Sequence, residues 1–222
     1  MSLLDDIEGI NRKSESRSRQ INGVATGVVT DNVDPENLKR VKVNFGWLSD
    51  KHETDWIRVS TLIAGKGRGS VFTPEIGDEV LVAFGHGDIN RPFVIGSLWN
   101  KEGEPPAKEM SNKEKNDIKG IKTKSGHEII ISDQQNKEKI EIHTKSGHKI
   151  LLDDSNDSEK ITITDLTGNN SMVFDSSENK ISIESKDRLE IKSSVIDIEA
   201  SDSMTLKSTR LLKIQGGIVN IN

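Results

Sequence analysis

The second half of the sequence repeats itself, and this repeat restricts the folds open to the chain more than any other feature. The segment Ile121-Lys-Thr-Lys-Ser-Gly-His127 returns as Ile142-His-Thr-Lys-Ser-Gly-His148, a shift of 21 residues, and a looser third copy carries Gly168 where the second carries Gly147. Each unit reads as strand, polar turn, strand. A fixed period of this length is typical of repeat architectures, in which neighbouring units bury a core together.

After Asn179 the unit shortens to pairs of apolar residues separated by one polar residue, and these doublets recur every seven or eight positions. The alternation predicts short strands with one apolar and one polar face, and such a strand cannot bury its apolar face alone. We expect the doublets to form the core of a trimer, at Ile181, Ile183, Leu189, Ile191, Ile196, Ile198, Met204, Leu206, Leu212, Ile214, Val219 and Ile221.

Two architectures fit these doublets. A single-chain solenoid is one, since three units supply roughly 24 residues for a three-faced coil. Three intertwined chains are the other. The small number of apolar residues, two per strand, favours this arrangement, because a lone solenoid of so few coils would expose its edges and ends. The pattern leaves open whether residues 120–180 interlace between chains or pair within one chain.

The composition agrees with few but regularly placed core residues. Hydrophobic residues make up 32% of the chain and charged residues 30%, and the net charge is −5. The acidic balance argues against a nucleic-acid partner, which would require a basic stripe. With no cysteine, the chain has neither a disulfide framework nor a thiolate metal site.

The rest of the chain divides into three segments. Residues 1–20 are predicted to be an N-terminal docking segment, without the basic and apolar regions of a signal peptide and without a membrane span, so synthesis in the cytoplasm is expected. Residues 21–100 carry five short β-rich runs, at 24–30, 40–45, 56–60, 79–84 and 92–98, which predict a small barrel. Residues 101–119, with Pro105-Pro106 and almost no apolar content, are predicted to be a linker before the repeat of residues 120–222.

An ordered series of turn motifs in the barrel segment resembles a known family. The series runs through Asp34-Pro35, Leu38-Lys-Arg40, Phe45-Gly-Trp47, Trp56-Ile-Arg58, Gly65-Lys-Gly-Arg-Gly69, Pro74-Glu-Ile-Gly77-Asp78 and Arg91-Pro92. It resembles the central spike proteins of contractile injection systems, among them phage baseplate assembly protein V and the valine-glycine repeat protein G of type VI secretion. The resemblance covers roughly residues 20–222 and continues into the β-repeat.

The resemblance implies an all-β homotrimer, in which an N-terminal OB-fold barrel acts as a collar and is followed by an intertwined triple-stranded β-helix. It implies a structural role without catalysis or cofactor, in a phage tail, tailocin or secretion-system baseplate. The implied partners are a baseplate hub protein, the tail tube, a small conical tip protein and, transiently, the target cell envelope. A lysozyme insert and a long hub module are missing from the pattern, and we expect the tip protein to bind Gly217, Ile218, Val219, Asn220, Ile221 and Asn222.

Three single motifs admit other interpretations. Threefold symmetry would bring copies of His127 or His148 together as metal ligands. A Lys-Ser-Gly-His turn that faces solvent accounts for the same residues. The Gly65–Gly69 segment lacks the spacing of a phosphate-binding loop, so a flexible barrel loop is expected. Lys39, Arg40 and Lys42 near two tryptophans would suit single-stranded nucleic acid or carbohydrate bound on an OB-fold, with a β-solenoid tail as the rest of the chain.

Overall fold

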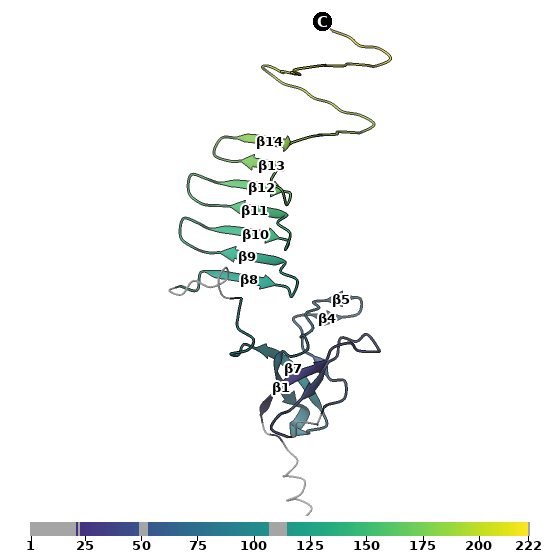
Figure 1. The fold of residues 1–222 in the computed structure, drawn as a ribbon, viewed down its shortest axis with the longest axis vertical. Helices are drawn as coiled ribbons and strands as arrows, with labels where there is room; N and C mark the ends of the chain where they lie inside the picture. The colour runs from purple at the N-terminus through teal and green to yellow at the C-terminus, as the bar shows by residue number, and fades with distance from the viewer. Residues whose placement is uncertain (1–20, 22, 49–52, 107–114, 222) are drawn as a thin grey trace, which may run out of the picture. The chain divides into compact units, whose positions relative to one another are not determined.

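A computed structural model describes residues 21, 23–48, 53–106 and 115–221 of the chain (Figure 1). The described residues are all β, with no α-helix and one 3-10 turn at Gly85–Gly87. The chain forms two compact units, Met1–Asp117 and Ile118–Asn222. The predicted docking segment, residues 1–20, lies outside the described residues, as do residues 107–114 of the predicted linker.

The N-terminal unit is built on a five-stranded sheet in the order β2-β1-β6-β7-β3. Neighbouring strands are antiparallel except β3 and β7, which are parallel. Backbone hydrogen bonds between Val41 and Ile57 join the two outer strands and close the sheet into a small barrel. The strands are β1 (Val24–Asp31), β2 (Lys42–Asn44), β3 (Arg58–Val59), β6 (Glu79–Phe84) and β7 (Pro92–Leu98). These strands confirm the five predicted runs to within a few residues.

The barrel core consists mainly of valine, because alternate side chains of each strand point inward. In β6 buried residues alternate with partly exposed ones along the whole strand. Removing each such side chain from water stabilises the fold by about 1.5–3 kcal/mol. The core comprises Val29, Val41, Val43, Phe45, Ile57, Val80, Val82, Phe84 and Val94.

The glycine-rich segment of the barrel differs from its prediction. Instead of a flexible loop, residues 60–73 form an ordered arm around the hairpin of β4 (Ala64–Gly65) and β5 (Arg68–Gly69). Gly67, with a φ of +68°, turns the hairpin, and the side chain of Thr61 is hydrogen-bonded to Ser70 at 2.6 Å. A Cβ on Gly69 would lie 2.5 Å from the carbonyl oxygen of Ile63, so this position excludes any side chain.

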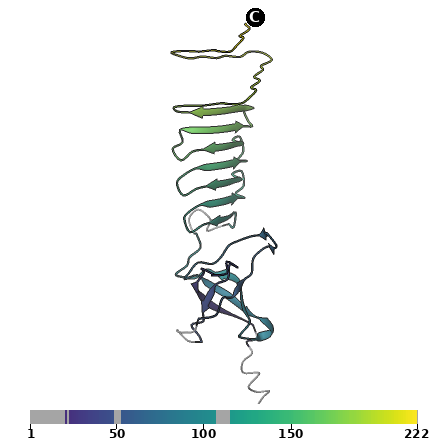
Figure 2. The same cartoon turned by 90° about the vertical axis from the view of Figure 1, so that its right-hand side faces the viewer.

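The C-terminal unit begins with an antiparallel meander of seven strands in which each strand pairs with its neighbours in sequence (Figure 2). Within one chain, residues 118–185 pair with one another along the whole meander. The repeat of strand, turn and strand is confirmed. The strands are β8 (Ile118–Lys122), β9 (Glu128–Ser132), β10 (Lys139–His143), β11 (Lys149–Asp153), β12 (Lys160–Thr164), β13 (Asn170–Asp175) and β14 (Lys180–Ser185).

Beyond β14 the chain runs back and forth without forming strands. Among the described residues 187–221, no backbone amide donates a hydrogen bond to a backbone carbonyl. The short strands predicted for the doublets from Leu189 onward therefore do not form in a single chain. The physical reason is that this segment has no neighbouring strand of its own chain with which to pair.

Candidate assembly surface

The register of the meander collects the apolar residues of the repeat into two straight columns on one face of the sheet. Ile142, for example, lies opposite Ile129 on one side and Ile150 on the other. One column contains Ile121, Ile129, Ile142, Ile150, Ile163, Met172 and Ile183. The second contains Ile131, Ile140, Leu152, Ile161, Phe174 and Ile181, and Lys119 occupies its position in β8.

This apolar face is not covered within its own unit. The isoleucine and leucine side chains of the two columns are 37% to 65% exposed. A monomeric soluble protein rarely leaves a contiguous apolar surface of this kind in water, and larger patches mark interaction sites. We call this surface the apolar face; it is what a partner would cover.

The opposite face of the sheet carries charged side chains that neutralise one another. Glu128 is paired with Lys122, and its second carboxylate oxygen lies 3.2 Å from His143 Nε2. Glu141 accepts from Lys139 at 2.6 Å and from Lys149 at 3.2 Å. Burial acts to raise the pKa of Glu141, but the two lysines outweigh it and lower that pKa below its usual value. This face is the less exposed of the two, with Glu128 6%, Ile130 8% and Ser132 4% exposed.

The predicted core residues fall into two groups. Ile181 and Ile183 lie in β14 and belong to the apolar face. The other ten lie in the unpaired segment, where even the least exposed of them, Val219, is 47% exposed. No core forms around them in a single chain. These ten are Leu189, Ile191, Ile196, Ile198, Met204, Leu206, Leu212, Ile214, Val219 and Ile221.

The residues predicted to bind a tip protein are described as far as Ile221, and Asn222 lies outside the described residues. Ile218 and Ile221 are each 85% exposed. The chain end therefore presents apolar side chains to its surroundings, but its geometry alone does not identify a ligand.

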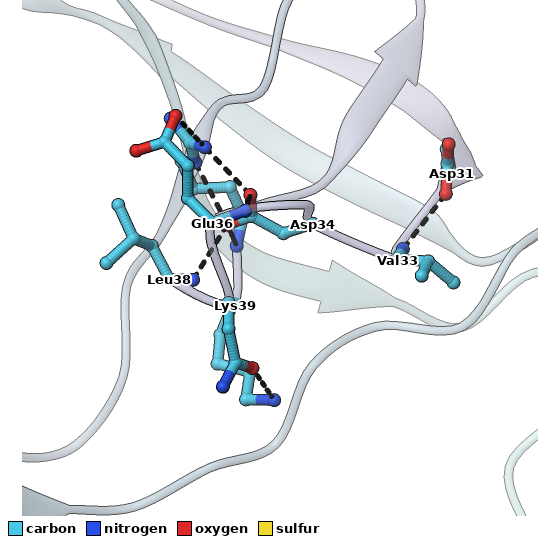
Figure 3. A network of polar contacts seen from close by, with 8 residues as sticks. Asp31, Val33, Asp34, Glu36, Leu38 and Lys39 are labelled. Carbon is cyan, nitrogen blue, oxygen red and sulfur yellow. Dashed lines mark hydrogen bonds and ion pairs between the residues drawn. The ribbon is translucent and has the colours of Figure 1, made fainter.

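In the barrel, the motif from Asp34 to Arg40 is a closed polar network (Figure 3). The Asp34 carboxylate accepts hydrogen bonds from the backbone amides of Glu36, Leu38 and Arg40 and from the Arg40 guanidinium at 2.7 and 2.9 Å. The Arg40 hydrogen bond, followed by those from the backbone, holds the pKa of Asp34 well below its usual range. The network fixes the loop with Leu38 62% exposed at its tip. The sequence contained the motif without revealing this role.

The cations proposed for a nucleic-acid groove are already engaged by neighbouring residues. Arg40 is bound by Asp34 and Glu36, and Lys42 donates to Glu53 at 2.8 Å. Lys42 also lies over the ring of Trp56, 5.3 Å from its centroid, and Lys39 donates to the side chain of Asn37. Two of the three cations, Arg40 and Lys42, are therefore neutralised by carboxylates, whereas Lys39 contacts a neutral amide and keeps its charge. This arrangement does not favour the nucleic-acid interpretation, because phosphate binding requires cations that are not already neutralised.

The remaining motifs form no chemical site. His127 Nδ1 accepts a hydrogen bond of 3.4 Å from the Lys145 amide. In the part of the chain that the structure describes, no group of three or more histidine or carboxylate side chains is arranged to hold a metal ion. The described residues likewise include no helix with the length and apolar character that crossing a membrane requires.

The arm offers a second apolar surface, which the sequence did not indicate. Leu62 is 89% exposed, and Phe72 on the opposite side of the hairpin is 65% exposed. A cleft of about 520 Å³ lies between the arm and the Asp34 loop, lined by Leu38 and Val59 among others. An arm with exposed apolar side chains is suited to contact another protein.

Comparison with known proteins identifies the barrel. Residues 25–99 match the family of type VI secretion system and phage-baseplate injector OB domains. The chain is 34% identical over 128 residues to the type VI secretion system spike protein VgrG1a of Pseudomonas aeruginosa, covering 54% of this chain and 20% of the relative. It is 34% identical to VgrG1b of the same organism, again over 54% of this chain and 17% of the relative.

A third relative is the spike protein VgrG3 of Vibrio cholerae, 31% identical over 47% of this chain and 11% of the relative. The chain thus spans a fifth or less of the length of these curated relatives. The matched OB domain and the spike-protein relatives indicate the same kind of protein, and a β-repeat follows the matched domain in this chain. Residues 25–99 match an injector OB domain, and over about half of its length the chain is similar to spike proteins of the type VI secretion system.

Proposed function

We propose that the chain is the structural spike of a contractile tail or injection machine and that three copies form one needle. The observation that carries the proposal is the apolar face, whose two columns continue in sequence as the doublets of the unpaired segment. Three such faces turned toward a common axis would enclose a narrow dry prism. Each isoleucine or leucine buried there would contribute about 1.5–3 kcal/mol.

The unpaired segment supports an intertwined end to the needle. Its described residues 187–221 make no backbone-to-backbone hydrogen bond within the chain, and buried backbone groups require partners. Strands of the other two copies would supply them, which gives the triple-stranded β-helix predicted from the doublets. A shaft made in this way has no lateral edge and resists unfolding under load.

The barrel is proposed to dock the needle to the baseplate hub and the tail tube. The match of residues 25–99 to an injector OB domain supports a baseplate role, and the exposed arm supplies an apolar contact. At the other end, the exposed residues 217–221, with Asn222, are proposed to hold a small tip protein. In this mechanism contraction drives the needle through the target envelope, and no residue acts as a catalyst.

Electron microscopy of the purified full-length chain tests the proposal. The expected particle is a thin rod with a wider, three-lobed base. Particles with a single small lobe, or rods without threefold features in class averages, would contradict it.

A further inference from the structure

The meander places its turns alternately on two lateral edges of the sheet. The turns at 123–127, 144–148 and 165–169 lie on one edge, here called the first edge, on the right in Figure 1. The turns at 133–138, 154–159 and 176–179 lie on the opposite edge, here called the second edge. Successive turns alternate between edges, so the two sets are offset in height by one strand spacing, about 4.8 Å.

The two edges differ in charge. The second edge is acidic, and its three turns contain Asp133, Glu138, Asp154, Asp157, Glu159 and Glu178 against the single lysine Lys137. The first edge contains Lys124, His127, Lys145 and His148 against the single carboxylate Asp165. That carboxylate is used inside its own turn, where it accepts from Thr167 at 2.8 Å and from the side chain of Asn170 at 3.0 Å.

Glu178 on the second edge lies 4.0 Å from Lys180, but other carboxylates of this edge have no such partner. Asp154, Asp157 and Glu159 form no ion pair with any residue that the structure describes. Lys145 on the first edge makes none with the described residues either. The sheet therefore carries carboxylates without ion-pair partners on its second edge and a lysine without one, Lys145, on its first edge.

The second edge also contains a cleft that could receive a side chain of opposite charge. A volume of about 370 Å³ is lined by Asp133 and Glu138 of one turn, by Asp154 and Glu159 of the next, and by apolar-face residues that include Leu152. Asp153, Lys139 and Lys160 at the strand ends also line it, so its carboxylates outnumber its two lysines. The cleft lies between the turns at 133–138 and 154–159. The turn at 144–148 lies at the height midway between them, because it joins β10 to β11.

We infer that the first edge of each copy docks against the second edge of the next copy, with the 144–148 turn and its Lys145 entering this acidic cleft. The inference rests on the proposed trimer and adds the rule by which its copies are oriented. If the copies are related by rotation about an axis parallel to the direction in which the strands stack, the first edge of one copy lies beside the second edge of the next. A twofold axis perpendicular to that direction would instead place two acidic second edges side by side. Exposed charge pairs add little affinity, but like charges side by side exclude the wrong arrangement.

Charge reversal on each edge tests the inference in the full chain. One variant carries Asp154→Lys and Glu159→Lys, a second carries Lys145→Glu and His148→Glu, and a third carries all four substitutions. Each protein is unfolded in denaturant, refolded over a series of concentrations at low salt and at about 1 M salt, where the Debye length is about 3 Å, and its mass is measured by light scattering.

We expect each single-edge variant to need about tenfold more protein to form trimer at low salt. The deficit should shrink at high salt, and the four-substitution variant should regain trimer formation because its edges are again complementary. A trimeric parent whose single-edge variants assemble equally well at low salt would overturn the edge pairing alone. So would a four-substitution variant no better than the single-edge variants. A monomeric parent would overturn the proposed trimer and the edge pairing with it.

Discussion

Ile140 of β10 lies directly opposite Leu152 of β11 on the apolar face, and neither side chain is covered within its own unit. They are 40% and 37% exposed, although both lie in the middle of a regular seven-stranded sheet. Two large apolar residues paired across strands at the centre of a sheet normally face a second layer. On our proposal that second layer is provided by two other copies of the chain.

Replacing Leu152 with alanine should therefore behave as a core substitution. We expect a loss of about 2–5 kcal/mol per chain in the free energy of unfolding, because the trimer would bury the side chain completely. Leu211→Ala is the matched control, since Leu211 is 75% exposed and lies outside the doublets, and it should change stability by less than about 0.5 kcal/mol. Denaturant titration followed by circular dichroism measures both. Equal small effects would mean that the apolar face stays in water.

Replacing Ile198 with aspartate tests the core of the intertwined segment. Three carboxylates would then lie near one axis without partners, and each would lose several kcal/mol of hydration. We expect no trimer on refolding. Thr205→Asp, at the polar position between Met204 and Leu206, should leave assembly intact. If the Ile198→Asp protein assembles and survives heating like the parent, Ile198 does not face a core.

Replacing Asp34 with asparagine should lower the melting temperature of the barrel by several degrees, because the charged acceptor for Arg40 and for three backbone amides is lost. The pKa of Asp34 is lowered from an ordinary value of 3.8, so its stabilisation is present above about pH 4 and is lost as the pH falls further. The difference between parent and variant should therefore shrink on acidification. Asp55→Asn, at an exposed site, is the control. A difference that does not depend on pH would show that the charge of Asp34 is not what stabilises the loop.

Replacing Gly69 with alanine should open the arm without unfolding the barrel. The added Cβ would meet the Ile63 carbonyl oxygen at 2.5 Å, and the φ of +154° is strained for any other residue. Hydrogen exchange should accelerate at the Ser70 amide, which donates to Ile63, while Val82 in the barrel core stays protected. Exchange at Ser70 that matches the parent would show that the arm tolerates a side chain there.

The alternation of side chains allowed much of this fold to be predicted. The β-rich run at 79–84 predicted β6, whose side chains are buried at every second position, and the 21-residue shift from Ile121 to Ile142 predicted the strands and turns of the meander. The features that escaped prediction depend on contacts between distant residues. The arm is held by Thr61 and Ser70, nine positions apart, and nothing in a single glycine-rich stretch indicates such a pair.

The apolar face was predicted only in part for a related reason. The doublets identified Ile181 and Ile183, but the longer repeat before them contributes most of the two columns, and their straightness depends on the strand register. A period of two shows which residues share a face within one strand, whereas pairing between strands decides which neighbours they meet. The opposite charges of the two edges likewise became visible only when the turns were assigned to their sides of the sheet.

The mass of the full-length chain in solution tests the central claim most directly. Three copies of a 24.6 kDa chain weigh 73.8 kDa, and light scattering in mild buffer should give this value, with slow dissociation in detergent because the strands are wrapped around one another. A stable species of 24.6 kDa at micromolar concentration would contradict the account, since the apolar face of a lone chain would then remain in water.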